Sequence, residues 1–131
     1  MEHRFGTHIV RFEEDIGYIQ FVGDLTPADL SALLGIVDDI IAQHRRYGAI
    51  IDARQMGAVS PATRRFLSEW KGSQYCYGNA VFGQGFALRV SMMMAMRAVQ
   101  LFTGRSFPVA FFNTETESKS WLQTRRRALV I

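Results

Sequence analysis

Two short motifs, Thr26-Pro27 and Ser60-Pro61, each separate a β-rich segment from a segment whose apolar residues have helical spacing. Threonine and serine cap helix N-termini through their side-chain oxygens. Proline suits the first helical position, because the N–H that it lacks would have no helical partner there. Each motif therefore predicts the start of a helix. Strands that alternate with helices in this way are typical of an α/β fold.

The rest of the chain continues this alternation. The predicted strands cover residues 5–12, 16–22, 49–52, 80–82 and 108–112. The predicted helices begin at Thr26, Ser60, Phe86 and Thr114. The order β-β-α-β-α-β-α-β-α predicts one α/β domain over residues 1–131. Its sheet is expected to be mostly parallel and opened by an antiparallel hairpin, with helices packed against it.

Size and composition fit a single domain with a substantial core, since 48% of the 131 residues are hydrophobic. No apolar run approaches the ~18 residues that a membrane-spanning helix needs, and the N-terminus lacks a signal-peptide core. We therefore expect a cytoplasmic protein without a transmembrane segment. The lone Cys76 excludes an internal disulfide and a multi-cysteine zinc site, and the three histidines have no metal-ligand spacing. Neither a metal nor a cofactor is expected.

Charge is divided unevenly along the chain. Residues 1–52 carry four arginines and nine acids, a net charge of −5, whereas residues 53–131 carry eleven basic residues and three acids, a net charge of +8. A polarised surface favours oriented association, so we expect a homo-oligomer or a charged protein partner. The alternative is that the two sets of charges interleave in the folded chain. Arginines 125–127 complement the negative end of a C-terminal helix and do not predict nucleic-acid binding.

The junction between Asp52 and Ser60 is the first candidate site. Asp52 follows the apolar run Ala49-Ile50-Ile51, and ligand sites of open α/β sheets gather at the C-terminal ends of strands. Asp52 is a candidate general base or anion gate, or else it caps the next turn or pairs with Arg54. Ser60 is a candidate phosphorylation site near Arg64, or else a plain helix cap. No serine–histidine–acid set or pair of carboxylates supports catalysis, so we expect no enzyme.

Methionine is concentrated in the third predicted helix, at positions 92, 93, 94 and 96. This side chain is adaptable and suits apolar surfaces that bind varied partners. Met93 and Arg97 are predicted to lie opposite an apolar stripe at positions 88, 92, 95 and 99. One interpretation is a partner or ligand surface that includes Met92, Met93, Met96 and Arg97. The other is a core helix with one or two exposed methionines.

Three stretches carry a family resemblance. They are Gly23-Asp24-Leu25-Thr26 after the hairpin, Ile50-Ile51-Asp52 followed by a loop and the helix at Ser60, and residues 111–122, which end in Trp121-Leu122. In these stretches the chain resembles the STAS-like family, the fold of bacterial anti-sigma-factor antagonists, and more loosely the CRAL-TRIO lipid carriers. The resemblance spans nearly the whole chain. It implies a STAS-like fold and a non-enzymatic protein that works by binding.

In the anti-sigma-factor antagonists, a partner kinase phosphorylates a serine at the start of the helix that corresponds to the one at Ser60. That serine lies in an Asp-Ser-Ser/Thr-Gly context, whereas this chain has Val59-Ser60-Pro61-Ala62-Thr63, which lacks the aspartate and the glycine. Ser60 matches by position. The resemblance therefore implies a protein partner, such as a kinase or a sigma-factor regulator.

Together these observations predict a bacterial regulatory domain that acts by protein–protein recognition. The alternative is a carrier or sensor of a lipid or small apolar ligand, with the methionine-rich helix as a pocket wall. A lipid carrier needs a continuous apolar cavity of roughly 300 Å³ or more behind that helix. A recognition module needs an exposed patch near residues 53–65 or 89–97.

Overall fold

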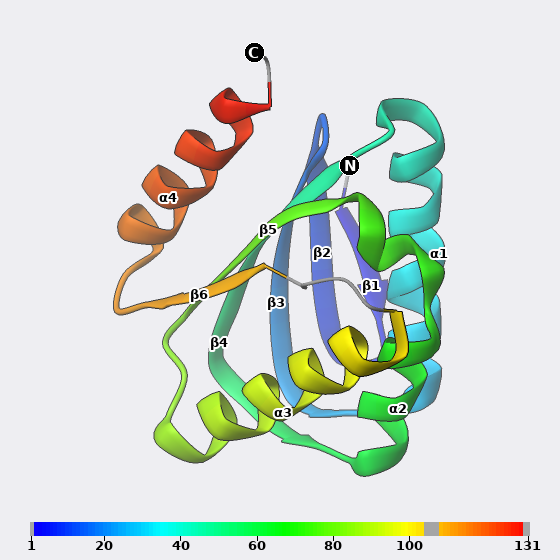
Figure 1. Ribbon diagram of the computed structural model, residues 1–131. Coiled ribbons are helices and arrows are strands. Elements are labelled where there is room, and N and C mark those ends of the chain that lie inside the picture. Colours follow the sequence, from blue (N-terminus) through cyan, green and yellow to red (C-terminus); the bar gives the residue numbers. More distant parts are fainter. Residues whose placement is uncertain (1, 104–107, 130–131) are drawn as a thin grey trace.

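The computed structural model describes residues 2–103 and 108–129, with the backbone alone at 88, 91, 95, 98, 99, 102 and 103. The described strands form one sheet in chain order, from β1 to β6 (Figure 1). The strands are β1 (Glu2–Phe5), β2 (His8–Glu13), β3 (Ile16–Leu25), β4 (Tyr47–Val59), β5 (Cys76–Phe82) and β6 (Val109–Phe112). The helices are α1 (Pro27–His44), α2 (Pro61–Glu69), the 3-10 helix η1 (Lys71–Tyr75), α3 (Phe86–Thr103) and α4 (Glu115–Ala128).

The sheet begins antiparallel and continues parallel. β1 pairs with β2, and β2 with β3, in antiparallel register, whereas β3, β4, β5 and β6 pair in parallel. α1, α2 and α3 connect successive parallel strands. The predicted α/β fold and the alternation of strands and helices are therefore confirmed.

Several strand boundaries differ from the prediction. β3 continues to Leu25 rather than ending at residue 22, and β5 begins at Cys76 rather than at residue 80. The predicted strand over residues 5–12 is divided by a turn at Gly6, whose φ is +61° and where a Cβ would lie 2.4 Å from Asp29 Oδ1. β4 does not end at Asp52 but continues to Val59, because its second half pairs with the end of β3, where Val59 lies opposite Leu25. The expected loop after Asp52 is thus a strand, since tertiary pairing overrides weak local β-propensity.

Helices cover both faces of the sheet. α1, α2 and α3 pack on one face and α4 on the other (Figure 1). The larger core lies beneath α1 to α3 and includes Phe21, Leu33 and Val81. The smaller core lies beneath α4 and joins Leu122 to Ile50. The two faces therefore present separate environments for any site.

A buried ion cluster fixes α4 to the turn between β2 and β3. Asp15 is 1% exposed, its Oδ2 lies 2.7 Å from Arg46 Nε, and its Oδ1 lies 3.0 Å from Arg126 Nη2. Arg126 also pairs with Glu14 at 2.5 Å, and Arg125 Nε donates to a carbonyl of β5 at 2.5 Å. Two of the three C-terminal arginines therefore anchor α4, in addition to complementing its negative end.

Candidate functional site

Ser60 is the N-cap of α2, as one of the two interpretations of the sequence proposes. Its Oγ accepts a hydrogen bond from Thr63 N at 3.1 Å. Thr63 Oγ1 donates to the carbonyl of Leu25 at 2.9 Å, so the Ser60 hydroxyl is the donor in its 2.9 Å contact with Thr63 Oγ1. Ser60 is exposed, whereas Thr63 is buried. The Ser60 hydroxyl thus has a complete structural role in joining α2 to the end of β3.

Replacing Ser60 by alanine should lower the free energy of unfolding by about 1 kcal/mol, because the Thr63 N–H loses its acceptor. Ser60→Asp should stay within about 0.5 kcal/mol of the wild type, since a carboxylate accepts the same N–H at the positive end of the helix. Urea titration of the three proteins measures both values. Equal midpoints for the wild type and Ser60→Ala would show that the cap does not stabilise the fold.

Asp52 pairs with Arg54, and this pairing is one of the alternatives that the sequence leaves open. Asp52 Oδ1 accepts from Arg54 N at 3.1 Å and from Arg54 Nε at 3.0 Å, while Oδ2 accepts from Nη2 at 2.7 Å. The side-chain hydrogen bonds from Arg54 hold the pKa of Asp52 below its ordinary value. A carboxylate stabilised in its ionised form by a guanidinium is a poor general base at neutral pH.

The sheet separates Asp52 from the residues of α2. Ile51 and Ala49 line a cavity beneath α1 to α3, whereas Ile50 and Asp52 line a groove on the face that α4 covers. Arg64 lines the first of these spaces. Asp52 and Arg64, both candidate site residues, therefore lie on opposite faces of the sheet, because successive side chains of a strand alternate in direction.

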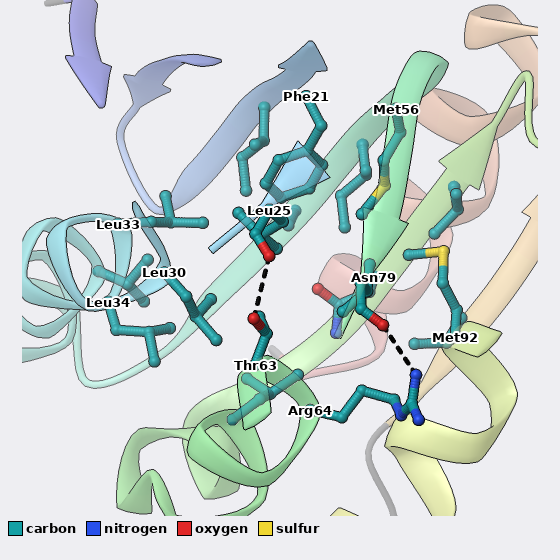
Figure 2. A pocket seen from close by; sticks show the side chains of 18 of the residues that line it. Phe21, Leu25, Leu30, Leu33, Leu34, Met56, Thr63, Arg64, Asn79 and Met92 are labelled. Atoms are coloured by element: carbon teal, nitrogen blue, oxygen red, sulfur yellow. Dashed lines mark hydrogen bonds between the residues drawn. The ribbon is translucent and has the colours of Figure 1, made fainter. Parts of the chain in front are cut away.

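An apolar cavity of about 120 Å³ lies between the sheet and the three helices α1, α2 and α3. Figure 2 shows Phe21, Leu30 and Leu34 on one side of this cavity and Met92 of α3 on the other. Met96 also lines it. The cavity is smaller than the roughly 300 Å³ expected of a lipid carrier. It is closer to the volume of about 150 Å³ at which an apolar cavity in a protein core binds benzene.

Arg64 and Asn79 bring polar groups to the wall of this cavity. They point toward one another in Figure 2, from α2 and β5 respectively. Arg64 is half-buried, and its Nη1 donates to the carbonyl of Val59 at 2.8 Å. Asn79 is buried, and its Nδ2 donates to Cys76 Sγ at 3.1 Å and more weakly to the carbonyl of Pro108 at 3.4 Å. The amide oxygen of Asn79 is therefore the atom that faces the guanidinium.

Cys76, whose Sγ accepts the hydrogen bond from Asn79, has a buried thiol. Burial raises its pKa to about 11. The thiol of an unfolded chain has a pKa of about 8.5, so above that pH the unfolded state loses a proton that the folded state keeps. The folded state consequently loses stability as the pH rises from 8.5 toward 11.

The free energy of unfolding should fall by about 1 kcal/mol between pH 8 and pH 9.5 through Cys76 alone. Urea titrations at the two pH values measure the change. Cys76→Ala is the control, and it should lack this part of the decrease. The same decrease in both proteins would assign the pH dependence to other groups.

The outer face of α3 is apolar and exposed. Phe86 is 84% and Leu101 86% exposed, and the exposed set also includes Val90, Met93 and Met94. These positions and Arg97 recur at helical spacing along one side of α3. Met93 and Arg97 therefore lie on this outer face, whereas Met92 and Met96 line the cavity. The four residues do not form the single surface that one interpretation of the sequence proposes, because helical spacing places them on two sides of α3. The other side chains of the predicted stripe, at 88, 95 and 99, lie outside the described residues.

Asn79 and Thr63 are the polar residues that the sequence analysis missed. Asn79 is a polar side chain within β5, every residue of which is buried, and Thr63 follows the cap residue Ser60 by three positions. A buried polar side chain in an apolar strand needs a hydrogen-bond partner, which is the signal that singles out Asn79. Among the described residues, no cluster of histidine, cysteine or acidic side chains could hold a metal ion, and no helix is long and apolar enough to cross a membrane.

Comparison with known proteins shows the fold. No protein-family model and no curated protein matches the sequence. An uncharacterised protein of the DUF3478 family from Shewanella loihica PV-4, whose crystal structure has a SpoIIAA-like fold, aligns with a TM-score of 0.60 and 21% sequence identity. The alignment covers 86% of this chain and 90% of that chain. The chain therefore has the SpoIIAA-like fold, in agreement with the STAS-like resemblance of its sequence.

Proposed function

We propose that this SpoIIAA-like domain is a non-catalytic interaction module that recognises an acidic protein partner through the outer face of α3. The observation that carries the proposal is the row of exposed apolar side chains on that face, namely Phe86, Val90, Met93, Met94 and Leu101. Contiguous exposed apolar surface of this kind marks interaction sites. A helix whose apolar residues follow one face is suited to bind in a groove, or beside another helix.

Charge supports an acidic partner. From residue 53 to residue 103 the chain has six basic side chains and one acid, Glu69. Arg97 lies within the apolar face of α3. Arg65 on neighbouring α2 is 77% exposed and pairs with Glu69 at 3.4 Å. Cationic groups around an apolar surface attract acidic segments and repel basic ones. A kinase or sigma-factor regulator with such a segment would fit this surface, in keeping with the SpoIIAA-like fold.

A second copy of the chain is the competing occupant. Residues 1–52 of the chain have a net negative charge, which this surface would attract. A homo-oligomer therefore stays a prediction. A symmetric contact of α3 with α3 is disfavoured, since it would bring the Arg97 side chains of both copies to one interface. This disfavours a symmetric dimer through α3, and photo-crosslinking distinguishes a different protein from a second copy.

Photo-crosslinking in the native host tests the proposal. Benzoylphenylalanine in place of Met93 should give one discrete adduct with an acidic protein. The same probe in place of Asp39, an exposed residue of α1, should not give it. An adduct with a second copy of this chain or with lipid would contradict the proposal. So would the same adducts from both positions.

A second function, the binding of a small apolar ligand, is favoured by the cavity of about 120 Å³ beneath α3. Its lining is almost entirely apolar, and Met92 and Met96 are adaptable wall residues. The volume suits a ring or a short branched chain rather than a lipid tail. In this function the domain would sense a small molecule on the inner side of the helix that it uses for recognition.

A further inference from the structure

We infer that the cavity beneath α3 binds a small organic acid, with the carboxylate on Arg64 and a hydrocarbon or aromatic body in the apolar interior. The inference rests on the small-ligand function proposed above and names its ligand class. The cavity volume of about 120 Å³ limits the body to roughly the size of one aromatic ring.

The charge of the cavity selects the head group. Arg64 is the single charged residue among the described residues that line the cavity, and none of these is acidic. A cation beside an apolar, low-dielectric space attracts an anion more strongly than it would in water. A guanidinium also matches the geometry of a carboxylate, with two parallel N–H donors.

The surrounding backbone and Asn79 hold the guanidinium in place. The carbonyl of Val59 accepts from Arg64 Nη1 at 2.8 Å. The Asn79 amide is fixed through its nitrogen by Cys76 and Pro108, and its oxygen faces Arg64 (Figure 2). Asn79 is therefore a positioning residue. Since Arg64 is half-buried, the carboxylate would lie at the outer end of the cavity and the apolar body at the inner end.

The methionines provide the readout. Met92 and Met96 line the cavity, whereas Met93 and Met94 lie on the outer face of the same helix. The full chain, labelled with carbon-13 at the methionine methyl groups, is titrated with benzoate and with its neutral counterpart benzamide. Benzoate should shift the signals of Met92 and Met96 saturably and leave those of Met93 and Met94 unchanged. Benzamide should bind at least tenfold more weakly.

Two adjacent arginines form the matched pair of variants. Arg64→Met keeps an unbranched apolar stem and removes the guanidinium with its charge, and it should weaken binding of benzoate at least tenfold. Arg65→Met changes an exposed neighbour on α2 that does not line the cavity, and it should leave the benzoate affinity unchanged. Ala49→Leu fills the cavity from the sheet side and should abolish binding of both probes. This variant keeps the test decisive if Arg64→Met does not fold.

The outcomes separate the two levels of the proposal. If neither probe binds, or if Ala49→Leu leaves the benzoate affinity unchanged, both the ligand-binding function and its ligand class are overturned. If benzamide binds as tightly as benzoate and Arg64→Met has no effect on either, the cavity still binds small apolar molecules. The assignment of an acid is then wrong.

Discussion

Asp15→Asn should lower the free energy of unfolding by about 3 kcal/mol, although the residue lies in a turn between two strands. Its carboxylate is 1% exposed and contacts Arg46 at 2.7 Å and Arg126 at 3.0 Å. The isosteric amide keeps the shape of the side chain but leaves two guanidinium groups without their shared anion. Removal of one member of a buried ion cluster is costly because the remaining charges stay partly desolvated.

Glu14→Gln is the matched control, because Glu14 precedes Asp15 and contacts the same Arg126, but its side chain is 72% exposed. This change should cost less than about 1 kcal/mol. Urea titration measures both values. A double-mutant cycle of Asp15→Asn with Arg126→Met should also give a larger coupling energy than the cycle of Glu14→Gln with Arg126→Met. Equal costs for the two acids would show that the buried cluster does not fix α4.

The second large effect is expected at the outer face of α3. Met93→Glu should weaken binding of the acidic partner about 100-fold, which is roughly 3 kcal/mol, because it removes an apolar contact and adds a repulsive charge. Met93→Lys removes the same contact but adds an attractive charge, so it should weaken binding by a smaller factor. The stability of both variants should stay near that of the wild type, since Met93 is exposed.

Isothermal titration of the partner recovered by crosslinking at position 93 measures these affinities. Raising the salt concentration should reduce the difference between the glutamate and lysine variants, because salt screens exposed charges. Equal losses for the two variants would rule out an acidic partner. Wild-type affinity in both would show that the partner does not bind on α3.

Local sequence signals were sufficient for most of the fold. Thr26 and Ser60 cap their helices through the predicted side-chain hydrogen bonds, and Pro27 and Pro61 occupy the first helical positions. The second half of β4 could not be predicted in this way. Its strand conformation comes from pairing with β3, and the register of that pairing depends on residues more than 30 positions away.

The candidate site was predictable only in part. Arg64, Met92 and Met96 could be named from the sequence, but the cavity that brings them together depends on the packing of three helices on the sheet. Asn79 enters this site because β5 pairs in parallel with β4 and β6, opposite Ala49 and Val109. Sheet register decides which face a strand side chain occupies, and a single sequence does not determine that register.

The most direct test of the central proposal is a titration of the methionine-labelled chain with the crosslinked partner. The methyl signals of Met93 and Met94 should shift saturably at one equivalent of partner, because both lie on the outer face of α3. Those of Met92 and Met56, which line the cavity, should change much less. Shifts confined to Met92 and Met56, or unchanged Met93 and Met94 signals with the partner in excess, would contradict recognition through this face.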